Sequence, residues 1–245
     1  MVGPTAIEMS RHTVGALMLP EAICLDLDGT LYSQRPLRLI MTLRLARTVL
    51  SSPREAIKTI RVVSAYRRAQ ESLRDSTKPC DIARAQIALT CQFTGYDVQT
   101  VTERTAVWFD HEPLRFLQRF IRPGLREFLT AAKARGIKLA ILSDYPAELK
   151  LAAMNLHDYF DIVMTAQDPA IGCFKPSPAG LHCIAKRFGI EPSRMLYIGD
   201  RPEVDAEAAR RAGMRSIIIH SGKHPADSVS IHVKTFLEAK QALGI

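Results

Sequence analysis

An apolar run at residues 22–25, Ala-Ile-Cys-Leu, leads directly into Asp26-Leu27-Asp28-Gly29-Thr30. Consecutive apolar residues without alternation are typical of a strand that is buried on both faces, as in a parallel sheet. The end of this strand would place two carboxylates in a tight turn. One carboxylate can act as a nucleophile while the other transfers protons, and with a divalent cation the pair suits phosphoryl transfer. The alternative is a turn that uses Asp and Gly only for their backbone preferences.

Apolar runs and helix-like segments alternate along the chain after Pro123-Gly124. We expect helices over 124–135, 147–155, 177–188, 203–212 and 233–243, and strands over 137–142, 161–164, 195–198 and 216–219. This alternation predicts βα units around a parallel sheet, and hence an α/β fold. Ligands bind at the carboxyl ends of the strands in such sheets. Asp26, Ser143 and Asp200, each at the end of a different expected strand, are therefore candidates for one shared site.

Residues 33–120 have a different texture, rich in leucine, arginine and alanine, which predicts helices. The segment holds 15 Lys+Arg and 8 Asp+Glu, so it carries +7 of the net charge of +8. A solvated helical surface accounts for such charge. The alternative is a basic insert that attracts a phosphorylated substrate or an anionic membrane surface. In that case the candidates are arginines in a stretch without acidic residues: Arg35, Arg38, Arg44 and Arg47.

Composition excludes several classes of protein. The chain has 245 residues, of which 47% are hydrophobic and 24% charged, and these globular proportions exclude global disorder and fibrous repeats. No apolar run reaches the ~18 residues that a membrane span needs. The 5 cysteines are odd in number and lack C-x-x-C spacing, so neither a disulfide framework nor a zinc knuckle is indicated. We therefore expect a cytoplasmic location.

Four motifs follow one another in a recognisable order. They are Asp26-Leu27-Asp28-Gly29-Thr30, Ile141-Leu142-Ser143-Asp144, Lys175-Pro176, and Tyr197-Ile198-Gly199-Asp200 followed by Asp205. Together they resemble the haloacid-dehalogenase-like hydrolase superfamily, specifically its phosphatase branch, over about residues 22–220. The resemblance implies a three-layer, Rossmann-like parallel sheet formed by 21–32 and 121–245, with an α-helical cap at 33–120. Residues 1–20 would form an N-terminal arm.

The resemblance also implies roles for individual residues. Asp26 would attack phosphorus to form an aspartyl-phosphate, Asp28 would act as general acid and then base, and Lys175 would neutralise negative charge. Gly29, Thr30 and Ser143, with Lys175, would bind the substrate. A Mg²⁺ ion would be held by Asp26, the backbone carbonyl of Asp28, and Asp200. Asp205 would bind the metal through water or orient Lys175.

The resulting expectation is a Mg²⁺-dependent phosphomonoesterase that acts on a small phosphorylated metabolite. The second carboxylate, Asp28, disfavours dehalogenation, because the dehalogenase branches lack it. A phosphomutase or phosphotransferase with the same intermediate, and a non-catalytic binding protein on this fold, stay open. Action on nucleic-acid ends is disfavoured, since the basic segment shows no nucleic-acid-binding motif. The sequence shows no transmembrane segment; peripheral membrane contact, oligomeric state and substrate identity are left open.

Overall fold

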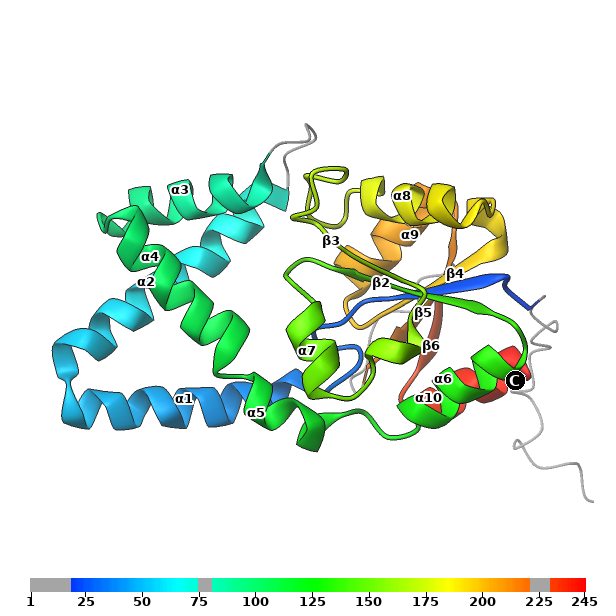
Figure 1. Cartoon of the computed structure of the whole chain (residues 1–245), viewed down its shortest axis with the longest axis horizontal. Coiled ribbons are helices and arrows are strands. Elements are labelled where there is room, and N and C mark those ends of the chain that lie inside the picture. Colours follow the sequence, from blue (N-terminus) through cyan, green and yellow to red (C-terminus); the bar gives the residue numbers. More distant parts are fainter. Residues whose placement is uncertain (1–18, 75–80, 221–229) are drawn as a thin grey trace, which may run out of the picture.

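The computed structural model, which describes residues 19–74, 81–220 and 230–245, contains a six-stranded parallel sheet in one half of the molecule (Figure 1). The strand order is β3-β2-β1-β4-β5-β6, so β1 lies in the interior of the sheet. The strands are β1 (Ala22–Leu25), β2 (Lys138–Ser143), β3 (Ile162–Thr165), β4 (Met195–Gly199), β5 (Arg215–Ile219) and β6 (Ser230–Val233). The α/β fold is therefore confirmed. Most of the expected N-terminal arm, residues 1–18, lies outside the described residues.

The last strand corrects the sequence prediction at the C-terminal end. A helix was expected over 233–243, but β6 ends at Val233 and the helix α10 spans Phe236–Leu243. Thr235 caps this helix by accepting a hydrogen bond from the backbone N–H of Glu238 at 3.2 Å. A cap of this kind sets the helix start two residues beyond the strand. In the run Ser-Ile-His-Val only Val233 is buried, and the other three residues are half-buried. This explains why β6 lacks the apolar signature of the interior strands.

Helices cover both faces of the sheet and make three layers (Figure 1). Ile23 and Leu25 of β1 pack on the side of α6, α7 and α10, whereas Ala22 and Cys24 pack on the side of α8 and α9. This alternation along a strand buried on both faces explains its uninterrupted apolar sequence. The bounds are α6 (Leu125–Ala134), α7 (Glu148–Ala153), α8 (Ala179–Phe188), a π-helical turn η5 (Pro202–Ala206) and α9 (Glu207–Ala212). Short 3₁₀ turns lie at η3 (His157–Tyr159) and η4 (Pro192–Arg194).

From Gln34 to Phe120 the described residues form helices and short connections that stand apart from the sheet (Figure 1). We call the elements from α1 to α5 the cap helices: α1 (Gln34–Ser51), α2 (Pro53–Arg74), α3 (Ile82–Thr94), α4 (Val98–Thr105), a π-helical turn η1 (Ala106–His111) and α5 (Leu114–Leu117). A 3₁₀ turn, η2 (Gln118–Phe120), follows them. This helical segment is consistent with the expected cap insertion. The division of the chain into separate domains stays a prediction.

The chain enters and leaves the cap helices through one narrow neck. Tyr32 and Ile121 form an isolated antiparallel bridge. The N–H of Ser33 donates to the carbonyl of Phe120 at 2.9 Å, and the N–H of Arg122 donates to the carbonyl of Leu31 at 2.9 Å. The two ends of the segment are thus held side by side directly after the Asp26–Thr30 turn. Within the described parts of the chain, no helix has the length and apolarity to cross a membrane.

Candidate active site

Asp26 occupies the carboxyl end of β1, and its side chain is buried. Its backbone N–H donates to the carbonyl of Ile198 at 2.8 Å, which keeps the residue in register with β4. One carboxylate oxygen accepts the Thr30 hydroxyl at 2.9 Å. The other accepts the Lys175 ammonium at 2.6 Å. The DLDGT turn therefore folds back so that its own threonine helps to fix its first aspartate.

Gly29 lies where a side chain has no room. Its φ of 108° is in the region that favours glycine, and a Cβ there would lie 2.4 Å from a carboxylate oxygen of Asp200. Its carbonyl accepts two hydrogen bonds from Arg122, at 2.8 and 3.0 Å. The glycine thus lets the first-motif turn approach the aspartate that follows β4. Neither Gly29 nor Thr30 lines the cavity described below, so their expected contact with substrate stays a prediction.

Lys175 connects the first motif to the last. Its Nζ lies 2.6 Å from Asp26, 2.7 Å from Asp205 and 3.0 Å from the Tyr197 hydroxyl. Burial alone would lower the pKa of Lys175, but the carboxylates of Asp205 and Asp26 outweigh it and hold the pKa well above its usual value. The ammonium therefore stays charged, whereas burial raises the pKa of Asp26 well above its usual value despite the charge of Lys175. Of the two roles expected for Asp205, the structure shows the contact that orients Lys175.

Asp205 itself is held by a side-chain cation and by backbone donors. Besides Lys175, one of its oxygens accepts the backbone N–H groups of Asp200 and Arg201, at 3.1 and 3.0 Å. Burial opposes the charged form, yet Lys175 and these backbone donors lower the pKa of Asp205. The residue sits in the π-helical turn η5, right after β4. A carboxylate kept charged in this way fixes the geometry of the β4 end.

Asp200 is the acidic group of the cluster that has no cationic partner among the described residues. Burial, reinforced by the nearby charge of Asp205, raises the pKa of Asp200 to about 7. One oxygen from each of Asp26, Asp200 and Asp205 falls within a span of 4.8 Å. Grouped carboxylate oxygens with excess negative charge fit a hard divalent cation such as Mg²⁺. The Asp28 carboxylate is not in this group, and the expected metal contact of its backbone carbonyl stays a prediction.

Asp28 faces a different set of partners, which the sequence analysis missed. Lys150 lies 2.8 Å from both of its carboxylate oxygens, and the Tyr32 hydroxyl donates to one of them. Burial and the Asp28 charge raise the pKa of Tyr32, so this phenol acts as a donor. Lys150 comes from α7 and is buried. A signal existed in the sequence: Lys150 shares the apolar helical face of Ala147, Leu151 and Met154.

Ser143 is the last residue of β2, as expected, and is fully buried. Its hydroxyl accepts the backbone N–H of Tyr145 at 3.2 Å and does not line the cavity. The structure thus brings Ser143 to the correct edge of the sheet. A contact between its hydroxyl and a phosphoryl oxygen stays a prediction.

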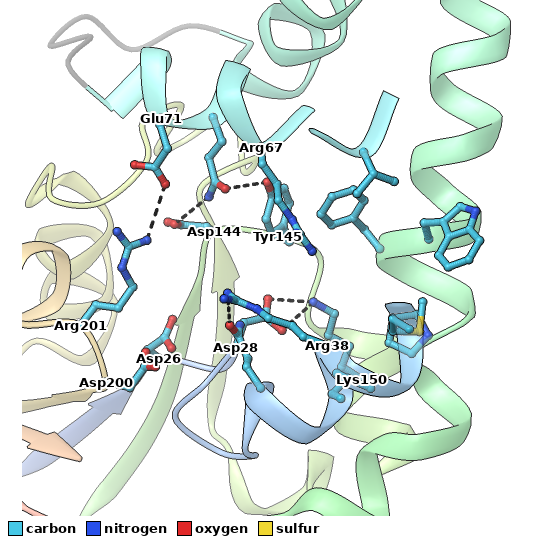
Figure 2. A pocket seen from close by; sticks show the side chains of 18 of the residues that line it. Asp26, Asp28, Arg38, Arg67, Glu71, Asp144, Tyr145, Lys150, Asp200 and Arg201 are labelled. Atoms are coloured by element: carbon cyan, nitrogen blue, oxygen red, sulfur yellow. Dashed lines mark hydrogen bonds and ion pairs between the residues drawn. The ribbon is translucent and has the colours of Figure 1, made fainter. Parts of the chain in front are cut away.

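A cavity of about 500 Å³ opens above these side chains, between the sheet edge and the cap helices. The sheet edge contributes Asp26, Asp28, Lys175, Asp200 and Asp205. The cap helices contribute arginines and apolar side chains from α1, α2 and η1. Figure 2 shows Asp26 and Asp200 at one side of this cavity, with Asp28, Arg38 and Lys150 beside them. The predicted catalytic carboxylates therefore form one wall of a site that the cap helices close.

The end of α2 is tied to the loop after β2. Arg74 forms an ion pair with Asp144 at 2.8 Å and also donates to the carbonyl of Lys175. Gln70 donates to Asp144 at 3.1 Å and accepts the Tyr145 hydroxyl at 2.8 Å (Figure 2). Asp144, whose role the sequence left open, thus joins a cap helix to the site. Arg201, equally open, pairs with Glu203 at 2.9 Å and with Glu71 of α2 at 3.6 Å.

Comparisons with known proteins agree with this geometry. Residues 20–213 match the family model for haloacid dehalogenase-like hydrolases. A phosphoserine phosphatase of Thermus thermophilus is 32% identical over 108 residues, which is 43% of each chain. A phosphoglycolate phosphatase of Escherichia coli K12 is 30% identical over 115 residues, 46% of this chain and 44% of that protein. The matching segment therefore spans less than half the length of these curated relatives.

Solved structures extend the likeness to the whole fold. A 2-haloacid dehalogenase from Pseudomonas syringae superposes with a TM-score of 0.65 and 21% identity, covering 93% of this chain and 99% of that one. A phosphatase from Thermococcus onnurineus gives a TM-score of 0.57 with 22% identity, covering 91% and 97%. At these identities the likeness concerns the fold alone. The family model matches most of the chain, and the aspartates lie together at the sheet edge. This chain therefore belongs to the haloacid dehalogenase-like hydrolases.

Proposed function

We propose that this protein is a Mg²⁺-dependent phosphomonoesterase that acts on a small phosphorylated metabolite through an aspartyl-phosphate on Asp26. The observation that carries the proposal is the buried Asp26 carboxylate, fixed by Lys175 and Thr30 at the wall of a cavity. A carboxylate with fixed orientation is suited to attack at phosphorus. The names of the two curated phosphatases each specify a small organic phosphate, which supports the substrate class.

The chemistry can be followed from this chain's own residues. An Asp26 oxygen forms a bond to phosphorus as the bond between phosphorus and the leaving oxygen breaks. Asp28 gives a proton to that leaving oxygen. Asp28 then takes a proton from a water molecule that attacks phosphorus, which frees inorganic phosphate and restores the Asp26 carboxylate. Lys175 keeps its positive charge beside Asp26 throughout and offsets negative charge on the transferring group.

The hydrogen-bond partners of Asp28 place a condition on these reaction steps. Lys150 and Tyr32 both donate to the Asp28 carboxylate. To protonate a leaving oxygen, Asp28 must carry a proton on one oxygen and turn it toward the substrate. Substrate binding must therefore release at least one of these two contacts. Lys150 and Tyr32 act as positioning residues in this proposal.

A divalent metal fits the donor set at the β1 and β4 ends. Asp26, Asp200 and Asp205 would hold Mg²⁺ together with the backbone carbonyl of Asp28, and the ion would offset the negative charge of the phosphoryl group. The unpaired Asp200 carboxylate supports this assignment. Lys175 already pairs with Asp26 and Asp205, so the metal would compensate mainly the charge of Asp200.

A panel of phosphorylated metabolites, assayed for release of inorganic phosphate with Mg²⁺, tests the proposal. We expect Asp26→Asn to lower kcat by about 10³-fold or more, since it keeps the shape but removes the nucleophilic charge. Chelation of divalent metal should abolish turnover, and added Mg²⁺ should restore it. Asp158→Asn makes the same substitution at an exposed site and should leave kcat unchanged.

Three outcomes would contradict the proposal. Full activity of Asp26→Asn would exclude the nucleophile. Undiminished turnover in excess chelator would exclude the metal. Consumption of the ester without release of phosphate would indicate transfer to a second hydroxyl, as in a phosphomutase.

A further inference from the structure

The cationic side chains that line the cavity fall into two groups. Four are already in ion pairs with carboxylates of the described residues: Arg74, Lys150, Lys175 and Arg201. The other two, Arg38 and Arg67, form no ion pair with any residue that the structure describes. Charged groups at a protein site are normally compensated by a counter-charge or by water. The cavity thus presents two guanidinium groups that are free to bind an anion.

These two arginines face the same space from different helices. Arg38 comes from α1 and donates to the Gln34 side chain, and Arg67 comes from α2 with its guanidinium carbon 5.6 Å from the centre of the Phe109 ring. Figure 2 shows Arg67 directed from α2 toward the region of Arg38 and Lys150. Arg67 is exposed in part, and its partial removal from water together with the positive charge of Arg38 lowers its pKa. The two like charges therefore repel each other, and a bound anion would relieve that repulsion.

Three carboxylates of the cavity wall already have donors or cations of their own. Asp28 is engaged by Lys150 and Tyr32, while Glu71 and Asp144 are engaged by Arg74. Figure 2 draws Asp26 and Asp200 together at one side of the cavity, and Arg38 next to Asp28. Arg38 therefore lies beside Asp28, the proposed donor of a proton to the leaving oxygen, and the leaving group of a substrate attacked by Asp26 would extend into the cavity that both arginines line.

Apolar side chains continue the wall outward from each arginine. Met41 and Leu45 follow Arg38 on one face of α1, at intervals of three and seven residues. Val63 and Ile60 precede Arg67 on one face of α2, at intervals of four and seven. Helical spacing of this kind brings each set to one surface. A ligand would thus meet the positive charges close to the catalytic edge and apolar surface farther out.

We propose that Arg38 and Arg67 bind a second anionic group, a carboxylate or a phosphate, carried by the leaving group of the substrate. The substrate class is then the phosphate esters of anionic alcohols. This assignment rests on the proposed function, because the leaving-group side is defined by attack from Asp26. Arginine suits this task because its planar fork matches the two oxygens of a carboxylate or phosphate.

Binding of stable phosphonates tests the assignment without turnover. The chain has one tryptophan, Trp108, and it lines the cavity, so its fluorescence can report ligands there. The probes are ethylphosphonate, 3-phosphonopropionate and propane-1,3-diylbisphosphonate, each titrated in the presence of Mg²⁺. We expect the second anion to lower Kd by about tenfold or more relative to ethylphosphonate. Whichever of the two probes with a second anionic group binds more tightly identifies the preferred anion as carboxylate or phosphate.

Variants assign the effect to the arginine pair. In Arg38→Gln/Arg67→Gln the advantage of the second anion should shrink to within about twofold. In Arg38→Lys/Arg67→Lys, which keeps both charges, part of the advantage should return. Arg47→Gln/Arg61→Gln removes two exposed arginines of the same helices that lie outside the cavity lining, and it should keep the full advantage.

Two results would overturn the assignment: equal Kd values for the three probes in the unmodified protein, or an advantage that survives in Arg38→Gln/Arg67→Gln. The corresponding phosphate esters, assayed in parallel, separate this inference from the proposed function. A protein that prefers the phosphonates with a second anionic group but hydrolyses no ester would refute the phosphatase proposal and leave the anion site in place. A protein that hydrolyses phosphate esters but shows no preference for a second anionic group would support the phosphatase proposal and refute the anion site.

Discussion

The charged groups of the sheet edge and those of the cap helices differ in how their charge is compensated. At the sheet edge Asp26, Lys175 and Asp205 are buried, and each lies within 2.7 Å of an opposite charge. On α1 most arginines are exposed, and Arg44 turns to Glu112 at 2.7 Å instead of to the cavity. A buried charge must find a partner in the fold, whereas an exposed one is satisfied by water. The charged groups of the sheet edge are therefore held in place by their partners, whereas exposed charged groups on the cap helices can bind ligands.

The largest expected effect would break the paired arrangement of the sheet edge. Lys175→Met leaves Asp26 and Asp205 buried without their shared cation. Removal of one partner of a buried ion pair costs about 3–5 kcal/mol in the free energy of unfolding. We also expect kcat to fall by about 10³-fold, because Asp26 loses its orientation and charge compensation. Urea unfolding and phosphate release measure the two effects.

A matched lysine provides the control. Lys186 is exposed on α8, and Lys186→Met should change neither quantity measurably. If Lys175→Met unfolded at the same urea concentration as the unmodified protein, the buried ion pairs would not be a source of stability.

The second prediction concerns Lys150, which pairs with Asp28, the proposed general acid. Lys150→Gln removes the cation that donates to both oxygens of Asp28. General acid–base steps contribute about 10²–10⁴-fold to rate, and a mispositioned Asp28 should lose about 10²-fold in kcat. Tyr32→Phe, which removes only the other donor, should cost less. A kcat of Lys150→Gln equal to that of the unmodified enzyme would show that Asp28 needs no positioning by α7.

The third prediction sharpens the comparison where the two regions meet. Arg74→Gln breaks the ion pair between α2 and Asp144, in which the Arg74 side chain is 8% exposed and that of Asp144 12%. We expect a loss of about 2 kcal/mol in the free energy of unfolding, below the range for a fully buried pair. We also expect kcat/KM to fall about tenfold, because the cap helices lose a tie to the site.

A double-mutant cycle isolates this contact. Combined with Asp144→Asn, the Arg74→Gln change should cost clearly less than it does alone, since both substitutions remove the same interaction. Strictly additive losses would mean that the ion pair does not link α2 to the β2 loop energetically.

The smallest expected effect belongs to the exposed charges. Screening shortens the reach of surface charge to about 8 Å at physiological ionic strength. Between 50 and 200 mM salt we expect kcat/KM to fall about threefold, with kcat nearly constant. The decline should be weaker in Arg38→Gln/Arg67→Gln. A flat profile in the unmodified enzyme would reduce the basic segment to a surface property.

The sheet edge was predictable from the sequence because parallel strands bring their carboxyl ends together. That rule alone placed Asp26, Ser143 and Asp200 at one edge, although the three lie far apart in the chain. The helical character of residues 33–120 followed from composition. The strand β6 was missed because an edge strand lacks the continuous apolar run of an interior one.

The cap side of the site was not predictable in the same way. A helix has the same local sequence whichever way it is turned, so the sequence could not tell that Arg38 lines the cavity while Arg44 does not. Arg67 depends on how α2 packs against the sheet edge. Lys150 was accessible in principle, because a lysine on an apolar helical face requires a buried partner. Asp28 is that partner.

The neck at Tyr32 and Ile121 has a consequence for how such an enzyme can change. The entropy lost in closing a loop depends on how its ends are brought together and only weakly on its length. Here the ends are already clasped by backbone hydrogen bonds on both sides of the bridge. The entropy of closing the segment between these ends therefore changes only weakly with the length of that segment. The cap helices are thus joined to the sheet through one hydrogen-bonded neck that directly follows the Asp26–Thr30 turn.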